Sequence, residues 1–127
     1  MELPKELKYS DDYSWVKIKG DTAVVGVIEP LTSKVDEFVF IRLPEEGKQI
    51  KKGDEYVSLE AVKWSGHLTS PLSGKIIEVN QPLFDDPLQI NNDPYKNWIM
   101  KIKISDKKEI DNLLDSEQIK ESLESQR

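Results

Sequence analysis

Lys63 is the residue whose place in the sequence points most clearly to chemistry. It lies between two apolar, strand-forming segments, 57–62 and 68–79, and Gly66 and residues 71–74 (Pro-Leu-Ser-Gly) supply turn residues on the return side. This pattern predicts a β-hairpin that holds Lys63 at its tip, in water and away from any core. The chemistry available there is that of an exposed primary amine. Because most exposed lysines are only solvated charges, the meaning of Lys63 depends on the residues around it.

The rest of the chain offers little for catalysis. It contains no cysteine, which excludes disulfides, thiolate metal sites and a cysteine nucleophile, and its one histidine is His67. No carboxylate pair has a spacing that requires an acid–base mechanism, and the oxygen-bearing residues within 85–93 lack the regular spacing of a calcium loop. Neither Gly47 nor Gly53 is followed by the Lys-Ser or Lys-Thr pair of a phosphate loop. We therefore expect no metal site and no enzyme activity of the chain's own.

Residues 60–74 resemble the lipoyl-lysine segment of the glycine cleavage system H protein family. In that family a Glu-Ser-Val-Lys-Ala pattern is followed by six residues and then by Pro-Val-Ser-Gly. Here the matching residues are 60–63 (Glu-Ala-Val-Lys) and 71–74 (Pro-Leu-Ser-Gly), at the family's spacing. Other matches are 43–47 (Leu-Pro-Glu-Glu-Gly), 79–80 (Val-Asn) and 91–95 (Asn-Asn-Asp-Pro-Tyr). The resemblance extends over about residues 7–123, nearly the whole chain.

The resemblance implies that Lys63 carries lipoate in amide linkage, attached by a lipoate ligase or lipoyl transferase, and that the chain is a swinging-arm carrier. In the family's cycle the oxidised arm accepts an aminomethyl group from glycine decarboxylase. Aminomethyltransferase passes the one-carbon unit to tetrahydrofolate, and dihydrolipoyl dehydrogenase reoxidises the arm. Glu60 matches the family's Glu and is a candidate recognition residue for a ligase or partner; the alternative is an ordinary solvated carboxylate.

Several residues depart from the family pattern and leave alternatives open. Tyr13 and Ser14 replace the family's His-Glu pair before Trp15, and Trp64 replaces the Ala after the lysine. We expect these departures to lie near surfaces that a partner contacts. Trp64 either shelters the dithiolane or marks a partner surface, or it has no role. His67 is either a proton shuttle for the arm or, more simply, a half-exposed strand residue. The alternative functions are an H-like lipoate-binding protein of a heterodisulfide-reductase-like sulfur oxidation system and an unlipoylated binding module. Biotin carriage is disfavoured, since that family places Met on both sides of its lysine.

Short apolar runs separated by turn residues predict a mainly β fold. We expect an N-terminal hairpin with Gly20–Asp21 at its turn, a strand over 38–43, and a half-buried strand over 98–104 with Lys101 and Lys103 in water. Helical spacing of Ile and Leu follows Asp106. The count is seven or eight strands in a two-sheet sandwich, followed by C-terminal helices. The resemblance specifies a flattened barrel-sandwich hybrid of the biotinyl and lipoyl-carrier type.

Length and charge limit the remaining choices. The 127 residues suit a single domain, residues 1–127, with a core at about 7–104 and a helical segment at about 106–124. A formal net charge of −6 argues against nucleic-acid binding. The absence of a long apolar run and of an apolar signal region leads us to expect a soluble, cytoplasmic protein that binds no membrane. We also expect a monomer.

Overall fold

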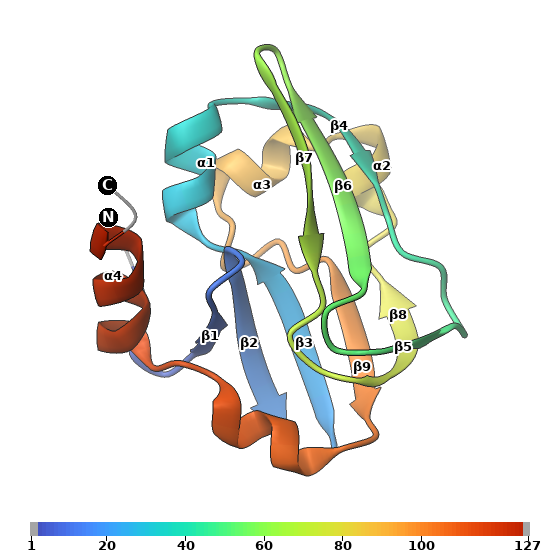
Figure 1. Ribbon diagram of the computed structural model, residues 1–127. Coiled ribbons are helices and arrows are strands. Elements are labelled where there is room, and N and C mark those ends of the chain that lie inside the picture. The colour runs from blue at the N-terminus through green and yellow to red at the C-terminus, as the bar shows by residue number, and fades with distance from the viewer. Residues whose placement is uncertain (1–2, 126–127) are drawn as a thin grey trace.

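The computed structural model describes residues 3–125, and two antiparallel β-sheets enclose its main core (Figure 1). One sheet has the strand order β1-β2-β3-β9-β8-β5 and the other the order β4-β6-β7. The strands are β1 (Lys8–Ser10), β2 (Ser14–Lys19), β3 (Thr22–Val27), β4 (Phe38–Arg42), β5 (Gln49–Ile50), β6 (Glu55–Ala61), β7 (Trp64–Thr69), β8 (Gly74–Val79) and β9 (Met100–Ile104). The two shortest, β1 and β5, lie in segments whose sequence predicts only a lead-in and a turn. The sheets do not close into a barrel.

The N-terminal hairpin forms as predicted. Strands β2 and β3 pair from Ser14↔Val27 to Lys19↔Thr22, and Gly20 at the turn has φ +62°. A two-residue hairpin turn of the favoured kind needs such a positive φ, which glycine adopts without steric cost. Strand β3 then pairs with β9, so the hairpin becomes part of the large sheet.

Alternation along β9 matches the predicted half-buried strand, although the strand begins at Met100 rather than at 98. Met100, Ile102 and Ile104 are buried, and Lys103 is exposed. Lys101 is only half-buried, because its ammonium group lies 4.6 Å from the centre of the Trp98 ring and 3.3 Å from Glu78 Oε1. Strand β9 lies between β3 and β8, and its buried side chains therefore contribute to the centre of the core.

Short helices lie around the sheets, and some of them contact the edge strands β4 and β1. They are α1 (Glu29–Val35), α2 (Pro82–Asp85), α3 (Leu88–Asn92), the 3₁₀ helix η1 (Lys107–Asn112) and α4 (Ser116–Ser125). Proline stands in the first turn of α1 and of α2, where its missing N–H costs no helical hydrogen bond. No helix within residues 3–125 is long and apolar enough to cross a membrane.

The C-terminal segment is interrupted between η1 and α4, whereas the Ile and Leu spacing suggests regular helix. Asp106 begins η1 as predicted, and its carboxylate accepts a hydrogen bond from Lys108 N. The Glu109 carboxylate does not bond back to this helix start and instead accepts hydrogen bonds from Ser73 N and Oγ. Leu114 exchanges two backbone hydrogen bonds with Tyr9. These contacts hold the chain extended at Leu114 and delay α4 to Ser116.

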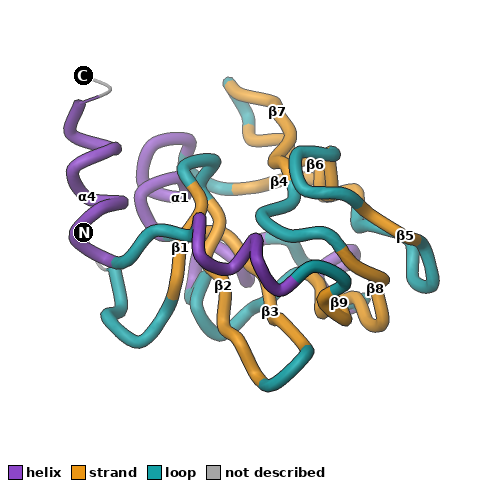
Figure 2. The backbone as a smooth tube through the Cα atoms, turned by 60° about the horizontal axis from the view of Figure 1, so that its bottom comes forward, coloured by secondary structure: helices purple, strands orange, loops and turns teal. Residues whose placement is uncertain are grey.

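Two hydrophobic clusters result. The larger lies between the sheets. The smaller lies between the large sheet, the N-terminal segment and α4, which stands apart on that side (Figure 2). Trp15, predicted as core, is 3% exposed there, and its indole N–H donates to Pro94 O. Trp98 is half-buried against the same cluster. The members of the smaller cluster are Leu7, Tyr9, Trp15, Val24, Ile28 and Ile119.

Candidate functional site

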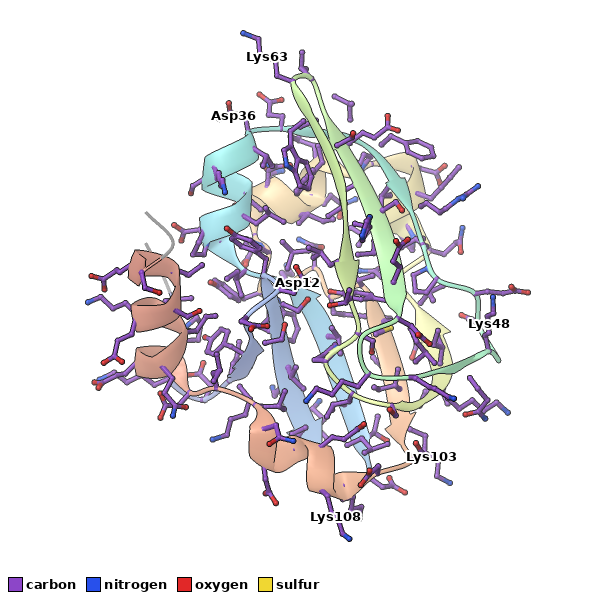
Figure 3. The ribbon with its side chains drawn as sticks, in the orientation of Figure 1. Asp12, Asp36, Lys48, Lys63, Lys103 and Lys108 are labelled. Carbon is purple, nitrogen blue, oxygen red and sulfur yellow. The ribbon has the colours of Figure 1, made fainter. Side chains whose placement is uncertain are left out.

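Strands β6 and β7 form the predicted hairpin, which extends beyond the other strands at one end of the molecule (Figure 1). Ala61 pairs with Trp64, leaving Val62 and Lys63 as a two-residue turn. Lys63 is exposed at the tip and points away from the body, at the opposite end from Lys103 (Figure 3). The hairpin therefore presents the Lys63 amine to any enzyme that approaches this end.

Polar contacts fasten the base of this hairpin to the large sheet. On β6, Tyr56 Oη lies 2.6 Å from Ser14 Oγ of β2 in a buried hydrogen bond. On β7, Thr69 donates from both its backbone N and its Oγ1 to the Asp12 carboxylate, at 2.6 and 2.7 Å. Sequence reasoning missed both pairings, because the partners in each are more than forty residues apart in the chain. The base is thus held while the tip remains in solvent.

Glu60 and His67 both lie on the outer face of the small sheet. Glu60 is exposed and stands opposite Phe40 of β4 and Ser65 of β7. His67 is exposed, and its Nε2 lies 3.1 Å from Glu55 Oε1, at the end of β6 away from the tip. The structure thus places Glu60 near Lys63 on the hairpin, as the sequence order requires. His67, by contrast, contacts Glu55 on the side away from Lys63.

The Pro-Leu-Ser-Gly part of the motif lies away from Lys63. Gly74 begins β8, and a Cβ placed there would lie 2.1 Å from Lys103 O of β9. Only glycine permits this close approach of two central strands. Ser73 contacts Glu109, and Ser70 Oγ donates to Leu72 O. The fixed spacing from Lys63 to Gly74 therefore reflects the length of the returning strand and the packing of β8 on β9.

A hollow of about 360 Å³ adjoins Lys63 on the side of α1 and β4. Val39 and Val62, which are 57% and 82% exposed, form its apolar part. Its full lining is Val35, Asp36, Glu37, Val39, Val62 and Lys63. The exposed Lys63 side chain beside this partly apolar hollow fits an attached acyl arm. Within residues 3–125, no three acidic or histidine side chains gather closely enough to hold a metal ion.

Nearly the whole chain matches one family. The sequence model described as "Glycine cleavage H-protein" matches residues 7–126. The chain belongs to this family. That membership confirms the predicted family and places the function as that of an H-type lipoyl carrier, a component of the glycine cleavage system.

Individual H proteins align with this chain over nearly their full length. The glycine cleavage system H protein of Staphylococcus haemolyticus (strain JCSC1435) is 40% identical over 124 residues, covering 97% of this chain and 98% of the relative. That of Staphylococcus carnosus (strain TM300) is 39% identical over 124 residues, with the same coverage. The crystal structure of a glycine cleavage system H protein from Mycobacterium marinum superimposes with a TM-score of 0.82 at 28% identity, covering 92% of this chain and 95% of that one. The predicted fold class is confirmed.

The structure accounts for the departure from the H-protein pattern before Trp15. The expectation that Ser14 belongs to a surface contacted by a partner is wrong, because its side chain is fully buried and bonds to Tyr56. Tyr13 is half-buried, has a φ of +59°, and accepts a hydrogen bond from Lys34 Nζ at its hydroxyl. Ser14 therefore contacts the hairpin base, whereas Tyr13 packs against both hydrophobic clusters and contacts Lys34 of α1.

The second departure from the H-protein pattern, Trp64, points inward. Along β7, Trp64, Gly66 and Leu68 face the core, whereas Ser65 and His67 face solvent. The Trp64 ring centre lies 6.5 Å from that of Phe38, and the side chain is half-buried against the main core. Trp64 is therefore not the freely exposed aromatic that its neighbour Lys63 would suggest.

Proposed function

We propose that Lys63 is the lipoyl-lysine of this chain and that the β6–β7 hairpin carries the lipoyl arm at its tip. The supporting observation is the position of Lys63, exposed at the tip of a hairpin whose base is fastened by the Asp12–Thr69 and Ser14–Tyr56 contacts. Tethering a reactive group to such a tip raises its effective concentration at each partner's active site. When attached, lipoate supplies the disulfide–dithiol chemistry that this cysteine-free chain lacks.

In this proposal the chain's own residues hold the lipoyl arm in an accessible position and take no part in its chemistry. The Lys63 amine provides the nitrogen of the amide, and its exposure lets a lipoate ligase or lipoyl transferase reach it. Glu60, exposed on β6, is the candidate recognition residue for that enzyme. The proposed later partners are glycine decarboxylase, aminomethyltransferase and dihydrolipoyl dehydrogenase. The curated relatives reported above, both H proteins of the glycine cleavage system, favour this set over a sulfur-oxidation complex. A single domain, a monomeric state and a cytoplasmic location remain predictions from the sequence.

The attachment is tested by intact mass and peptide mapping. The chain is incubated with lipoate, ATP and a purified lipoate ligase, alongside Lys63→Arg and the control Lys103→Arg at the opposite end of the molecule. We expect one lipoyl increment, mapped to Lys63, in the parent chain and in Lys103→Arg, and none in Lys63→Arg. Modification of Lys63→Arg would place the attachment on another lysine and overturn the assignment of Lys63. No modification of the parent chain, here and in its native host, would favour an unlipoylated binding module.

The pathway is tested separately with the modified chain. Lipoylated protein is added to purified glycine decarboxylase, aminomethyltransferase and dihydrolipoyl dehydrogenase with glycine, tetrahydrofolate and NAD⁺. We expect glycine-dependent NADH formation that requires the lipoylated form. A lipoylated chain that supports no turnover with these enzymes would leave the carrier in place and assign it to another lipoate-dependent system.

A further inference from the structure

The turn that carries Lys63 is not of the kind that normally closes a two-residue hairpin. The favoured turns, types I′ and II′, need a positive φ at the first loop residue, and type I′ needs one at both. Neither Val62 nor Lys63 has a positive φ, and neither is glycine, asparagine or aspartate. Turns with negative φ twist against the flanking strands and tend to splay them. Something besides the turn must therefore hold the two strands together at the tip.

An aromatic contact lies at that point. Phe38 pairs with Ala61 across β4 and β6, and Ala61 pairs with Trp64 across β6 and β7. The three side chains thus form one row on the inner face of the small sheet. The rings of Phe38 and Trp64 meet beside the small Ala61, with 6.5 Å between centres and 54° between planes. This contact joins β4 to the last pair of the hairpin, directly beside Lys63.

Gly66 determines where the Trp64 indole lies. A Cβ built on Gly66 would be 2.6 Å from Cζ2 and 2.9 Å from Cη2 of the indole. The ring therefore rests on the Gly66 backbone, two residues along on the same face of β7. These atoms are at the far end of the Trp64 side chain, so a methyl group at residue 66 would displace the ring without breaking a backbone contact.

We propose that Trp64, seated on Gly66 and against Phe38, is a positioning residue that holds the Val62–Lys63 turn in the single geometry read by the lipoate-attaching enzyme. The inference rests on the proposed function, because it presumes that Lys63 is modified. Trp64 acts through the turn that carries the Lys63 amine and takes no part in the acyl transfer itself. Without the indole, the enzyme must order the turn on binding, which weakens binding of the acceptor and leaves the chemical step unchanged.

The test measures lipoate ligase kinetics with the acceptor protein as the varied substrate. The variants are Trp64→Ala, Gly66→Ala and the conservative Trp64→Phe, with His67→Ala as a control on the opposite face of the same strand. For Trp64→Ala and Gly66→Ala we expect KM for the acceptor to rise roughly five- to thirtyfold with kcat unchanged, the range given by ordering about one residue. Trp64→Phe should have a KM close to that of the parent, because phenylalanine keeps most of the ring contact. His67→Ala should have the parental KM.

A second measurement separates this inference from the proposed function. Amide hydrogen exchange at residues 62–65 should be faster in Trp64→Ala and Gly66→Ala than in the parent, while exchange at the hairpin base stays the same. The inference would be overturned if Trp64→Ala and Gly66→Ala fold and show the same KM, and the same rate of amide hydrogen exchange at residues 62–65, as the parent. If the parent chain is not lipoylated at all, the proposed function fails, and parental tip exchange in both variants would still overturn the role of Trp64. Should Trp64→Ala fail to fold, Gly66→Ala and Trp64→Phe carry the same test.

Discussion

Ser14 Oγ and Tyr56 Oη lie 2.6 Å apart in a buried hydrogen bond that joins the two sheets. Tyr56 belongs to β6, seven residues before Lys63, and Ser14 begins β2. The contact therefore connects the hairpin that carries Lys63 with the sheet that forms most of the body. A second link, from Asp12 to Thr69, holds the adjoining strand β7.

Removing one partner of the Ser14–Tyr56 pair should destabilise the fold more than removing both. Tyr56→Phe leaves the buried Ser14 hydroxyl without its partner, which should lower the free energy of unfolding by about 1–3 kcal/mol. Ser14→Ala should have a similar effect. Urea denaturation of the two single variants and the double variant gives the coupling energy directly. Strictly additive effects would show that the hydrogen bond contributes nothing to stability.

The Asp12 carboxylate should stabilise the fold through its hydrogen bonds to the base of the hairpin. Asp12→Ala removes the acceptor of both Thr69 hydrogen bonds and should lower the free energy of unfolding by about 1.5–3 kcal/mol. Asp11→Ala, at the exposed neighbouring position, is the matched control and should stay within about 0.5 kcal/mol of the parent. Equal stability of the two variants in urea denaturation would contradict the role assigned to Asp12.

Two glycines should respond differently to alanine. At Gly74 the new Cβ would lie 2.1 Å from Lys103 O, so β8 and β9 must move apart, at a cost of about 3 kcal/mol or more. At Gly20, with φ +62° and open space around it, alanine meets only the left-handed backbone penalty of about 1–2 kcal/mol. Thermal unfolding of Gly74→Ala and Gly20→Ala compares the two. A smaller loss at Gly74 than at Gly20 would contradict the close approach of β8 and β9.

Tyr56 should also make stability depend on alkaline pH. Burial raises its pKa above the ordinary value of 10.0, the hydrogen bond with Ser14 lowers it in part, and Asp12 raises it further. Because the folded-state pKa is the higher one, this stabilisation is complete below about pH 10 and declines as the unfolded chain ionises above it. We therefore expect the stability gap between the parent and Tyr56→Phe to be constant up to about pH 10 and to narrow above it. Urea denaturation across this range measures the gap, and a constant gap would refute the assignment.

Local patterns in the sequence were enough to locate the hairpin and its lysine. Alternation along 98–104, the Gly20–Asp21 turn and the apolar runs on both sides of Lys63 predict elements that the structure contains. Such patterns depend on neighbouring residues, whose side chains share a face at fixed spacing. The family resemblance added the expected role of Lys63, which its local surroundings alone do not specify.

Contacts between distant residues were decided only by the tertiary structure. The sequence shows a helical pattern after Asp106, but bonds from Glu109 to Ser73 and from Leu114 to Tyr9 interrupt it. The sequence suggests that Ser14 lies near a surface contacted by a partner, yet packing against Tyr56 buries the Ser14 side chain. It shows Trp64 beside an exposed lysine, and the pleat of β7 turns the indole inward onto Gly66 and Phe38. Side-chain hydrogen bonds and ring contacts depend on which strands become neighbours, and no local pattern encodes that choice.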